Sequence, residues 1–342
     1  MATPIETDAL VIGAGPVGLF QAFQLGLQGI ACQLVDALPH VGGQCAELYA
    51  DKPLYDIPGI PVCTGRELVE RLQQQIAPFK PPLHLGQTVE SLQATDDGRW
   101  AVTSHTGTAW RARTVFIAAG VGAFVPRSLP LEGLAAHMGR QIHFASDTLP
   151  DWTGQHLLVA GDGDSALQTC LDAAEHAASV TLVHRRDQFS AEAARIDAFR
   201  AAQATGGVRF VAGQPTAIVC ENGRLSGLTL LSPEGQENTL ACDQMVMALG
   251  LSPRLGPVAQ WGLQIERKQL VVNTETFATS APGIFAVGDI NTYPGKKKLI
   301  LCGFHEATLA AFGAAAHLWP EEKTLLQYTT TSTALHKRLG LI

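Results

Sequence analysis

Ala9-Leu10-Val11-Ile12-Gly13-Ala14-Gly15-Pro16-Val17-Gly18 is the stretch that decides the fold of this chain. Four apolar residues lead into a Gly-x-Gly-x-x-Gly fingerprint, which predicts a buried strand, a tight turn and a helix. A second copy has the same order and reads Leu157-Leu158-Val159-Ala160-Gly161-Asp162-Gly163-Asp164-Ser165-Ala166. Two such copies predict an α/β chain with two Rossmann-like, three-layer dinucleotide-binding domains.

Each fingerprint works through its backbone. The first glycine allows the turn, the second lets the backbone approach a pyrophosphate, and the last position packs the helix on the strand. The pyrophosphate then lies at the helix N-terminus, where unpaired N–H groups and the macrodipole favour negative charge. The residues expected to hold the two dinucleotides are Gly13, Gly15, Pro16 and Gly18 in the first copy, and Gly161, Gly163, Asp164 and Ser165 in the second.

The residue twenty-three positions after each first glycine distinguishes the two nucleotides. In the first copy this residue is Asp36, whose carboxylate accepts hydrogen bonds from a ribose 2′-hydroxyl and so predicts FAD or NAD. In the second copy it is His184, followed by Arg185 and Arg186, and a basic pair suits a 2′-phosphate. The second domain should therefore hold NADP. A chain that holds a flavin and NADP is built to transfer electrons.

Composition agrees with a two-domain enzyme. The chain has 342 residues, of which 46 % are hydrophobic and 16 % charged, and its net charge of −7 gives no case for nucleic acid or an anionic membrane as partner. No stretch approaches the roughly 20 apolar residues that span a bilayer, and the N-terminus lacks a signal-peptide core. We therefore expect a cytoplasmic protein. None of the seven cysteines forms a Cys-x-x-Cys pair, so free thiols and no metal site are expected.

Two Gly/Ala/Pro-rich segments look like crossings between domains, residues 119–126 and 279–283. They predict a discontinuous FAD-binding domain of residues 1–120 and 281–342, with an NADP-binding domain of residues 121–280 inserted between. The Gly/Pro-rich stretch 38–64 is too long for a simple turn, and loops of that length are usually functional.

Several further motifs carry a family resemblance. They are Gly42-Gly43-Gln44-Cys45, Tyr55-Asp56-Ile57-Pro58-Gly59, His184-Arg185-Arg186 and the segment from Gly288-Asp289 through Tyr293-Pro294-Gly295-Lys296. Over essentially its full length the chain resembles the ferredoxin(flavodoxin)–NADP reductases of the thioredoxin-reductase type. The resemblance implies an enzyme, commonly homodimeric, that passes a hydride from NADPH to flavin N5 and then single electrons to ferredoxin or flavodoxin. No protein residue needs to act as an acid or base.

The resemblance also assigns roles to individual residues. Asp36 would bind the adenosine ribose of FAD, Val89 would contact the adenine through its backbone, and Asp289 would bind the ribityl chain or pyrophosphate. Residues implied to surround the flavin ring are Gln44, Tyr49, which would stack on one face, Phe124, and Tyr328 and Thr330 in the C-terminal tail, which would cover the other face. The basic run Lys296-Lys297-Lys298 is a candidate landing site for an acidic carrier.

The same residues also bear on three other functions. Thioredoxin reduction needs a dithiol shortly before the second fingerprint, and residues 136–155 contain no cysteine, which argues against it. An NAD(P)H oxidase could use Cys45 as a peroxidatic thiol. A catalytically idle flavin-binding protein is the third alternative, although it would have no need of the second fingerprint. The last two stay open on sequence grounds.

Overall fold

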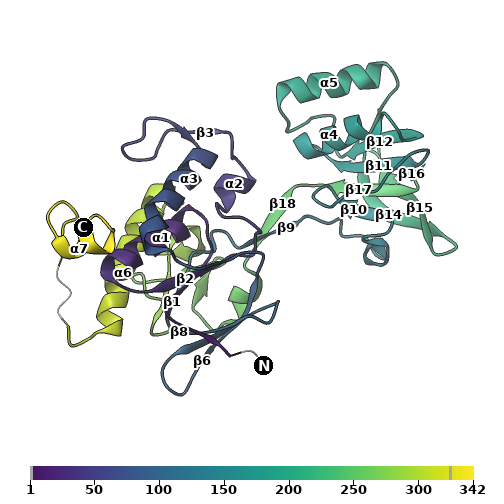
Figure 1. Cartoon of the computed structure of the whole chain (residues 1–342). Coiled ribbons are helices and arrows are strands. Elements are labelled where there is room, and N and C mark those ends of the chain that lie inside the picture. Colours follow the sequence, from purple (N-terminus) through teal and green to yellow (C-terminus); the bar gives the residue numbers. More distant parts are fainter. Residues whose placement is uncertain (1–2, 323–325) are drawn as a thin grey trace. The chain divides into compact units, whose positions relative to one another are not determined.

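A computed structural model describes residues 3–322 and 326–342, and the side chains at 123–125, 251 and 253 are not described. The chain forms two compact units (Figure 1). Unit 1 joins Met1–Ala123 to Arg254–Ile342, and unit 2 is Phe124–Pro253.

Unit 1 is built on a mainly parallel sheet whose central strand is the one before the first fingerprint. Residues 9–12 of this strand are almost fully buried, as expected for a strand covered on both faces. The strand order is β5-β2-β1-β8-β7-β6, and β21 pairs with the second half of β8. The bounds of these strands are β1 Ile5–Ile12, β2 Cys32–Val35, β5 Leu83–His84, β6 Val89–Ala94, β7 Trp100–Ser104, β8 Ala109–Ile117 and β21 Ile284–Ala286.

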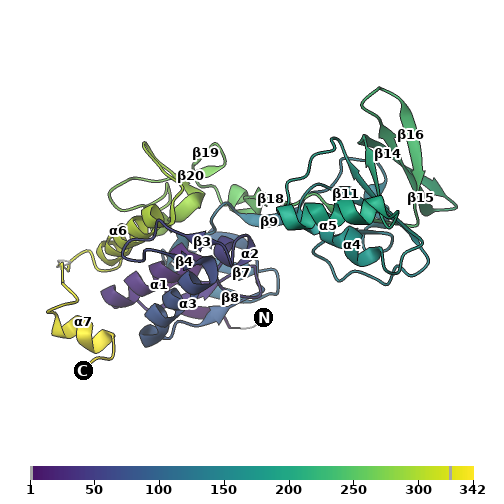
Figure 2. The same cartoon turned by 90° about the horizontal axis from the view of Figure 1, so that it is seen from above.

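The helices α1 (Pro16–Gln28), α3 (Gly65–Ile76) and α6 (Ile300–Leu318) pack side by side in unit 1 (Figure 2). Pro16 occupies the first turn of α1, where its missing N–H costs nothing. Helix α3 begins with a capping box, in which the Thr64 hydroxyl accepts from the Glu67 N–H and Glu67 accepts from the Thr64 N–H. No helix in residues 3–322 or 326–342 is long and apolar enough to cross a membrane.

The remaining elements of unit 1 are short. The stretch 38–64 contains α2 Gln44–Glu47, β3 Pro53–Leu54 and β4 Cys63–Thr64. The later elements are η1 Ala77–Phe79, η3 Gly256–Gln260, β19 Ile265–Glu266, β20 Gln269–Val271, η4 Gly288–Ile290, β22 Asn291–Thr292 and α7 Thr333–Arg338.

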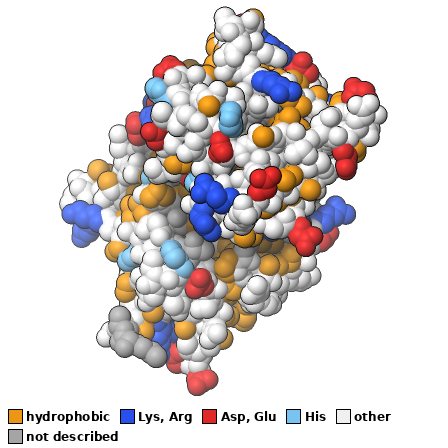
Figure 3. Space-filling view, turned by 90° about the vertical axis from the view of Figure 1, so that its right-hand side faces the viewer, with side chains coloured by type: hydrophobic (Ala, Val, Ile, Leu, Met, Phe, Trp, Pro, Cys, Tyr) orange, Lys and Arg blue, Asp and Glu red, His pale blue; other side chains and the backbone are white. Residues whose placement is uncertain are grey.

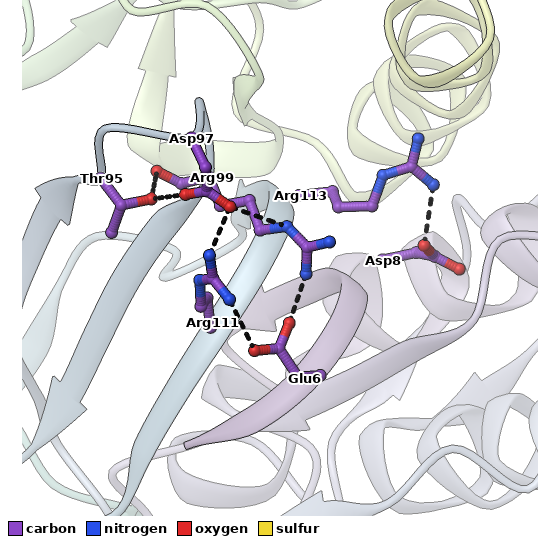
Figure 4. A network of polar contacts seen from close by, with 7 residues as sticks. All are labelled: Glu6, Asp8, Thr95, Asp97, Arg99, Arg111 and Arg113. Carbon is purple, nitrogen blue, oxygen red and sulfur yellow. Dashed lines mark hydrogen bonds and ion pairs between the residues drawn. The ribbon is translucent and has the colours of Figure 1, made fainter. Parts of the chain in front are cut away.

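A surface network of ion pairs joins β1 to β8 and to the β6–β7 turn (Figure 4). Glu6 on β1 pairs with Arg99 and Arg111, and both arginines also contact Asp97 in the turn. The side chains of this network are about 36–52 % exposed, so each pair contributes little to stability, of the order of 0–1 kcal/mol. The network fastens the hairpin to the start of β1, at the opposite end of that strand from the fingerprint.

Unit 2 has an all-parallel sheet in the order β10-β17-β11-β12-β13 and an antiparallel sheet β14-β15-β16. The sheet strands are β10 Ile142–Phe144, β11 His156–Gly161, β12 Ser179–His184, β13 Arg209–Ala212, β14 Gln214–Glu221, β15 Arg224–Leu231, β16 Glu237–Ala241 and β17 Gln244–Ala248. The helices are α4 Asp164–Ala173, α5 Ala193–Ala204 and the short η2 Leu134–His137.

Alternate residues of the parallel strands serve two cores on opposite faces of this sheet. Leu157 and Val159 pack with residues of α4 and α5, whereas Leu158 packs with Leu228 of the antiparallel sheet. This alternation follows from the two-residue period of a strand. Unit 2 therefore has three layers, which confirms the predicted α/β class.

The second domain boundary differs from the expected one. Residues 254–280 belong to unit 1 and not to unit 2, because Val258, Leu270 and Phe277 are buried in the core of unit 1. The segment 279–283 is a tight turn, in which the Thr279 N–H donates to the Ile284 carbonyl. The connections between the units run through β9 Ala123–Pro126 and β18 Leu251–Arg254, which pair with each other.

Candidate cofactor-binding sites

The first fingerprint forms a turn in which its first two glycines meet different surroundings. A Cβ added to Gly13 would lie 2.4 Å from the Ala118 carbonyl oxygen of the neighbouring strand end, so the residue must be glycine. A Cβ on Gly15 would meet only Gly43 Cα, at 3.8 Å. Gly15 is the N-cap of α1 and no described side chain caps that end. The helix N-terminus is thus open to a pyrophosphate.

Asp36 lies at the end of β2 and joins the fingerprint directly. Its carboxylate accepts from the Ala14 N–H at 2.5 Å and from the Leu38 N–H at 2.8 Å. Burial raises the pKa of Asp36, while these two hydrogen bonds lower it. The Asp36 carbonyl accepts from the Gln87 N–H at 2.8 Å, which brings the start of β6, with buried Val89, beside the acid. Asp36 is therefore hydrogen-bonded to the segment that leads into β6 and Val89.

Gln44 and Asp289 meet although they stand far apart in the sequence. The Gln44 side-chain amide donates to the Asp289 carboxylate at 3.3 Å. Tyr49 is half-buried in the same region, and its hydroxyl lies 3.6 Å from the Cys45 sulfur. Burial raises the pKa of Tyr49, and nearby Cys45 and Asp289 raise it further, so the phenol stays protonated. Gln44, Tyr49 and Asp289, which the resemblance assigns to the flavin, thus lie in one region of unit 1.

Cys45 itself is fully buried. Burial is also the main cause that raises the pKa of the Cys45 thiol. A reactive cysteine needs a thiolate and access, and Cys45 has neither.

A buried ionic cluster behind Asp289 was not anticipated from the sequence. Glu306 in α6 is completely buried, and its carboxylate accepts from Lys296, Tyr293, Asn291 and the Gly288 N–H. The lysine expected to lead a surface patch is therefore paired inside unit 1, with a side chain only 7 % exposed. Lys297 and Lys298 are exposed. The signal available was Glu306 as the sole acidic residue of the largely apolar helix α6, which follows the Tyr-Pro-Gly-Lys segment.

Within unit 1, the C-terminal tail lies away from Gln44 and Asp289. Arg338 of α7 donates to the Leu27 carbonyl at the end of α1 opposite the fingerprint (Figure 1). Tyr328 and Thr330 precede α7 and are exposed. The structure thus does not bring these two residues to Gln44 and Asp289. The side chain of Phe124 lies outside the described part of the chain.

The second fingerprint repeats the geometry of the first. A Cβ on Gly161 would lie 2.3 Å from the Ala248 carbonyl oxygen, whereas one on Gly163 would meet nothing closer than the Ser190 carbonyl at 3.9 Å. Gly163 is the N-cap of α4, again without a capping side chain among the described residues. The Asp164 carboxylate accepts from the Glu192 N–H and forms an ion pair with Arg195. Ser165 is exposed. A second open helix N-terminus results.

Arg185 and Arg186 follow the end of β12, and both are exposed. Neither forms an ion pair with any residue that the structure describes. The loop after them returns to the fingerprint, because the Ser190 N–H and hydroxyl both donate to Asp162. His184 is held in the same loop by the Arg186 carbonyl at 3.0 Å. Arg185 and Arg186 therefore lie at the start of the loop that returns to the fingerprint, with exposed side chains.

Comparison with known proteins agrees with this organisation. Residues 7–310 match the family described as pyridine nucleotide-disulphide oxidoreductase. A protein of Paracidovorax citrulli named ferredoxin–NADP reductase is 58 % identical, with 98 % of this chain and 97 % of that protein covered. Proteins of the same name from Acidovorax sp. and Albidiferax ferrireducens are 57 % and 51 % identical, each with 99 % of this chain and 97 % of the relative covered.

Solved structures share the fold at low identity. Thioredoxin reductase of T. acidophilum aligns with a TM-score of 0.59 at 20 % identity, covering 91 % of this chain and 98 % of that one. Bacillithiol disulfide reductase of Staphylococcus aureus aligns with a TM-score of 0.63 at 15 % identity, covering 93 % of this chain and 100 % of that one. At such identities these similarities describe the fold alone.

Proposed function

The chain belongs to the pyridine nucleotide-disulphide oxidoreductase family, and we propose that it acts there as a ferredoxin (or flavodoxin)–NADP reductase that uses FAD and NADP(H). One contrast carries the proposal. The first nucleotide site ends in an acid held against its fingerprint, and the second ends in two exposed arginines. Relatives that are 50–58 % identical over nearly their whole length and named ferredoxin–NADP reductase support it.

The residues of unit 1 fit FAD. Asp36 accepts from the ribose, the open N-terminus of α1 takes the pyrophosphate, and Asp289 with Gln44 lies where the ribityl chain and ring would be held. Tyr49 supplies an aromatic face for the ring and keeps water from it. When bound, FAD accepts a hydride from NADPH and releases electrons singly to the carrier.

The residues of unit 2 fit NADP(H). The open N-terminus of α4 takes the pyrophosphate, with Gly163, Asp164 and Ser165 around it. Arg185 and Arg186 bind the 2′-phosphate through charge-assisted hydrogen bonds, which NADH cannot make. The enzyme should therefore prefer NADPH over NADH.

The proposal also covers the carrier protein, the oligomeric state and the location of the enzyme. Lys297 and Lys298 form a small basic pair near the start of α6, where an acidic carrier would land. On the face in Figure 3, side chains of both charges are intermixed. A homodimer and a cytoplasmic location complete the proposal. The location is supported by seven free cysteines, since thiols stay reduced in the cytosol.

The rival functions are less well supported. A peroxidatic role in an NAD(P)H oxidase would need a reactive thiol, and Cys45 is buried with a raised pKa. A catalytically idle flavoprotein would have no use for the exposed arginine pair at the second site.

The test measures NADPH-dependent reduction of cytochrome c with and without added ferredoxin or flavodoxin. We expect strong stimulation by one of the carriers. Equal rates with and without them, together with rapid oxygen consumption, would favour the oxidase. A flavin that NADPH does not bleach under anaerobic conditions would favour the idle protein.

A further inference from the structure

The turn that carries Asp289 is held from both sides by buried side chains. The Gly288 N–H donates to Glu306 Oε2 at 2.7 Å, and the Gly288 carbonyl accepts from Lys296 Nζ at 2.8 Å. Both backbone groups of the residue before Asp289 are thus bound by one ion pair. An ordinary turn needs no such support.

The next residues of the turn are held by Gln269 on β20. Its side-chain amide donates to the Asp289 carbonyl at 3.0 Å and to the Asn291 carbonyl at 2.7 Å. The backbone of Asp289 is therefore fixed on either side, while its carboxylate is left to face Gln44.

The ion pair behind this largely buried turn is costly to desolvate. Glu306 is completely buried and Lys296 nearly so, and a buried charge is stable only if its partners satisfy it. Glu306 meets this condition, because Asn291 and Tyr293 also donate to it, at 2.9 Å each. Burial and the adjacent Glu306 raise the pKa of Tyr293, so its hydroxyl remains a donor. The Glu306 carboxylate is thus satisfied, while Asn291 Oδ1 has no hydrogen-bond partner among the described residues. A buried network in which the charge is satisfied favours one conformation of the turn.

We propose that Lys296 and Glu306 are positioning residues for the bound flavin, which act by holding the Gly288-Asp289 turn so that the Asp289 carboxylate meets FAD. The inference rests on the proposed function, because it takes FAD as the ligand of Asp289. Lys296 accordingly serves the cofactor and not the carrier. Pre-organisation of this type reduces the conformational-entropy cost of binding FAD.

The test is a double-mutant cycle read as the dissociation constant of FAD. Apoprotein is titrated with FAD, and binding is followed by flavin fluorescence in wild type, Lys296→Met, Asp289→Ala and the double variant. We expect Lys296→Met to weaken binding about tenfold or more in the wild-type background and less than about threefold when Asp289 is already absent. The control Lys337→Met, an exposed lysine of α7, should leave FAD affinity unchanged.

Urea unfolding of each apoprotein accompanies the titrations. If Lys296→Met does not fold, Glu306→Gln carries the same cycle, because it keeps the size of the side chain and removes the charge. An equal loss of affinity with and without Asp289 means a purely structural role and overturns the inference, as does unchanged affinity. A wild-type protein that binds no FAD would instead reject the proposed function on which the inference rests.

Discussion

The two fingerprints differ in how far each is prepared for its nucleotide. In unit 1 the strand-end acid is already hydrogen-bonded to the fingerprint through Ala14, and a buried ion pair fixes the turn of Asp289. In unit 2 the strand end carries two exposed arginines without ion partners among the described residues. A prepared site costs little to occupy and suits a resident cofactor, whereas an open one suits a cosubstrate that leaves every turnover.

Substitution of the first glycine of each fingerprint should have the largest effect on its own site. Gly13→Ala and Gly161→Ala place a Cβ 2.4 and 2.3 Å from a neighbouring carbonyl oxygen, so both strain their units by about 1–3 kcal/mol. We expect Gly13→Ala to purify without flavin and without activity. Gly161→Ala should keep its flavin and lose response to NADPH. Flavin absorbance per chain and NADPH bleaching measure the two effects, and identical phenotypes would mean that the sites are not separate.

The arginine pair gives the next largest effect. Hydrogen bonds to charged groups contribute about 1.5–3 kcal/mol each, so Arg185→Ala with Arg186→Ala should raise the KM for NADPH at least about 100-fold. The KM for NADH should hardly change, because that nucleotide has no 2′-phosphate. Steady-state carrier reduction with both nucleotides provides the measurement. A parallel loss with NADH would show that the arginines do not read the phosphate.

Asp36→Asn tests the corresponding residue of the first site, at the end of β2. The amide keeps the shape of the side chain but loses the charge that strengthens its bonds to the Ala14 N–H and to a ribose. We expect the dissociation constant of FAD to rise about tenfold, with KM for NADPH unchanged. Fluorescence titration of the apoprotein measures the first quantity. If Asp36→Asn changed the preference between NADPH and NADH and left the FAD dissociation constant unchanged, Asp36 would bind the nicotinamide nucleotide and not FAD.

A smaller effect of pH follows from the raised pKa of Asp36. Between its ordinary value of 3.8 and its folded value, the folded apoprotein binds more protons than the unfolded chain. The stabilising contribution of Asp36 is therefore complete below pH 3.8 and is lost as the pH rises through the folded pKa. Urea unfolding of wild type and Asp36→Asn should give a difference that declines over this interval and then levels off. A difference that grows with pH would require a lowered pKa.

Local patterns predicted much of this organisation. Each fingerprint, its flanking strand and the residue at the next strand end lie within about 25 residues, so short-range geometry brings them together. Gln44 and Asp289 were identified only through family resemblance, because their contact spans 245 positions.

Two features required the tertiary structure. The segment 279–283 has the composition of a linker, but the burial of Leu270 and Phe277 assigns the residues before it to unit 1. Lys296 stands in a basic run that resembles a solvated loop. Its buried partner Glu306 lies on the next helix, and only packing reveals that pair.

An anaerobic titration of the purified protein with NADPH and, separately, with NADH tests the central claim most directly. The account predicts a yellow protein whose flavin absorbance is bleached by NADPH at concentrations at least about tenfold below those of NADH. A colourless protein, or equal bleaching by the two nucleotides, would contradict it.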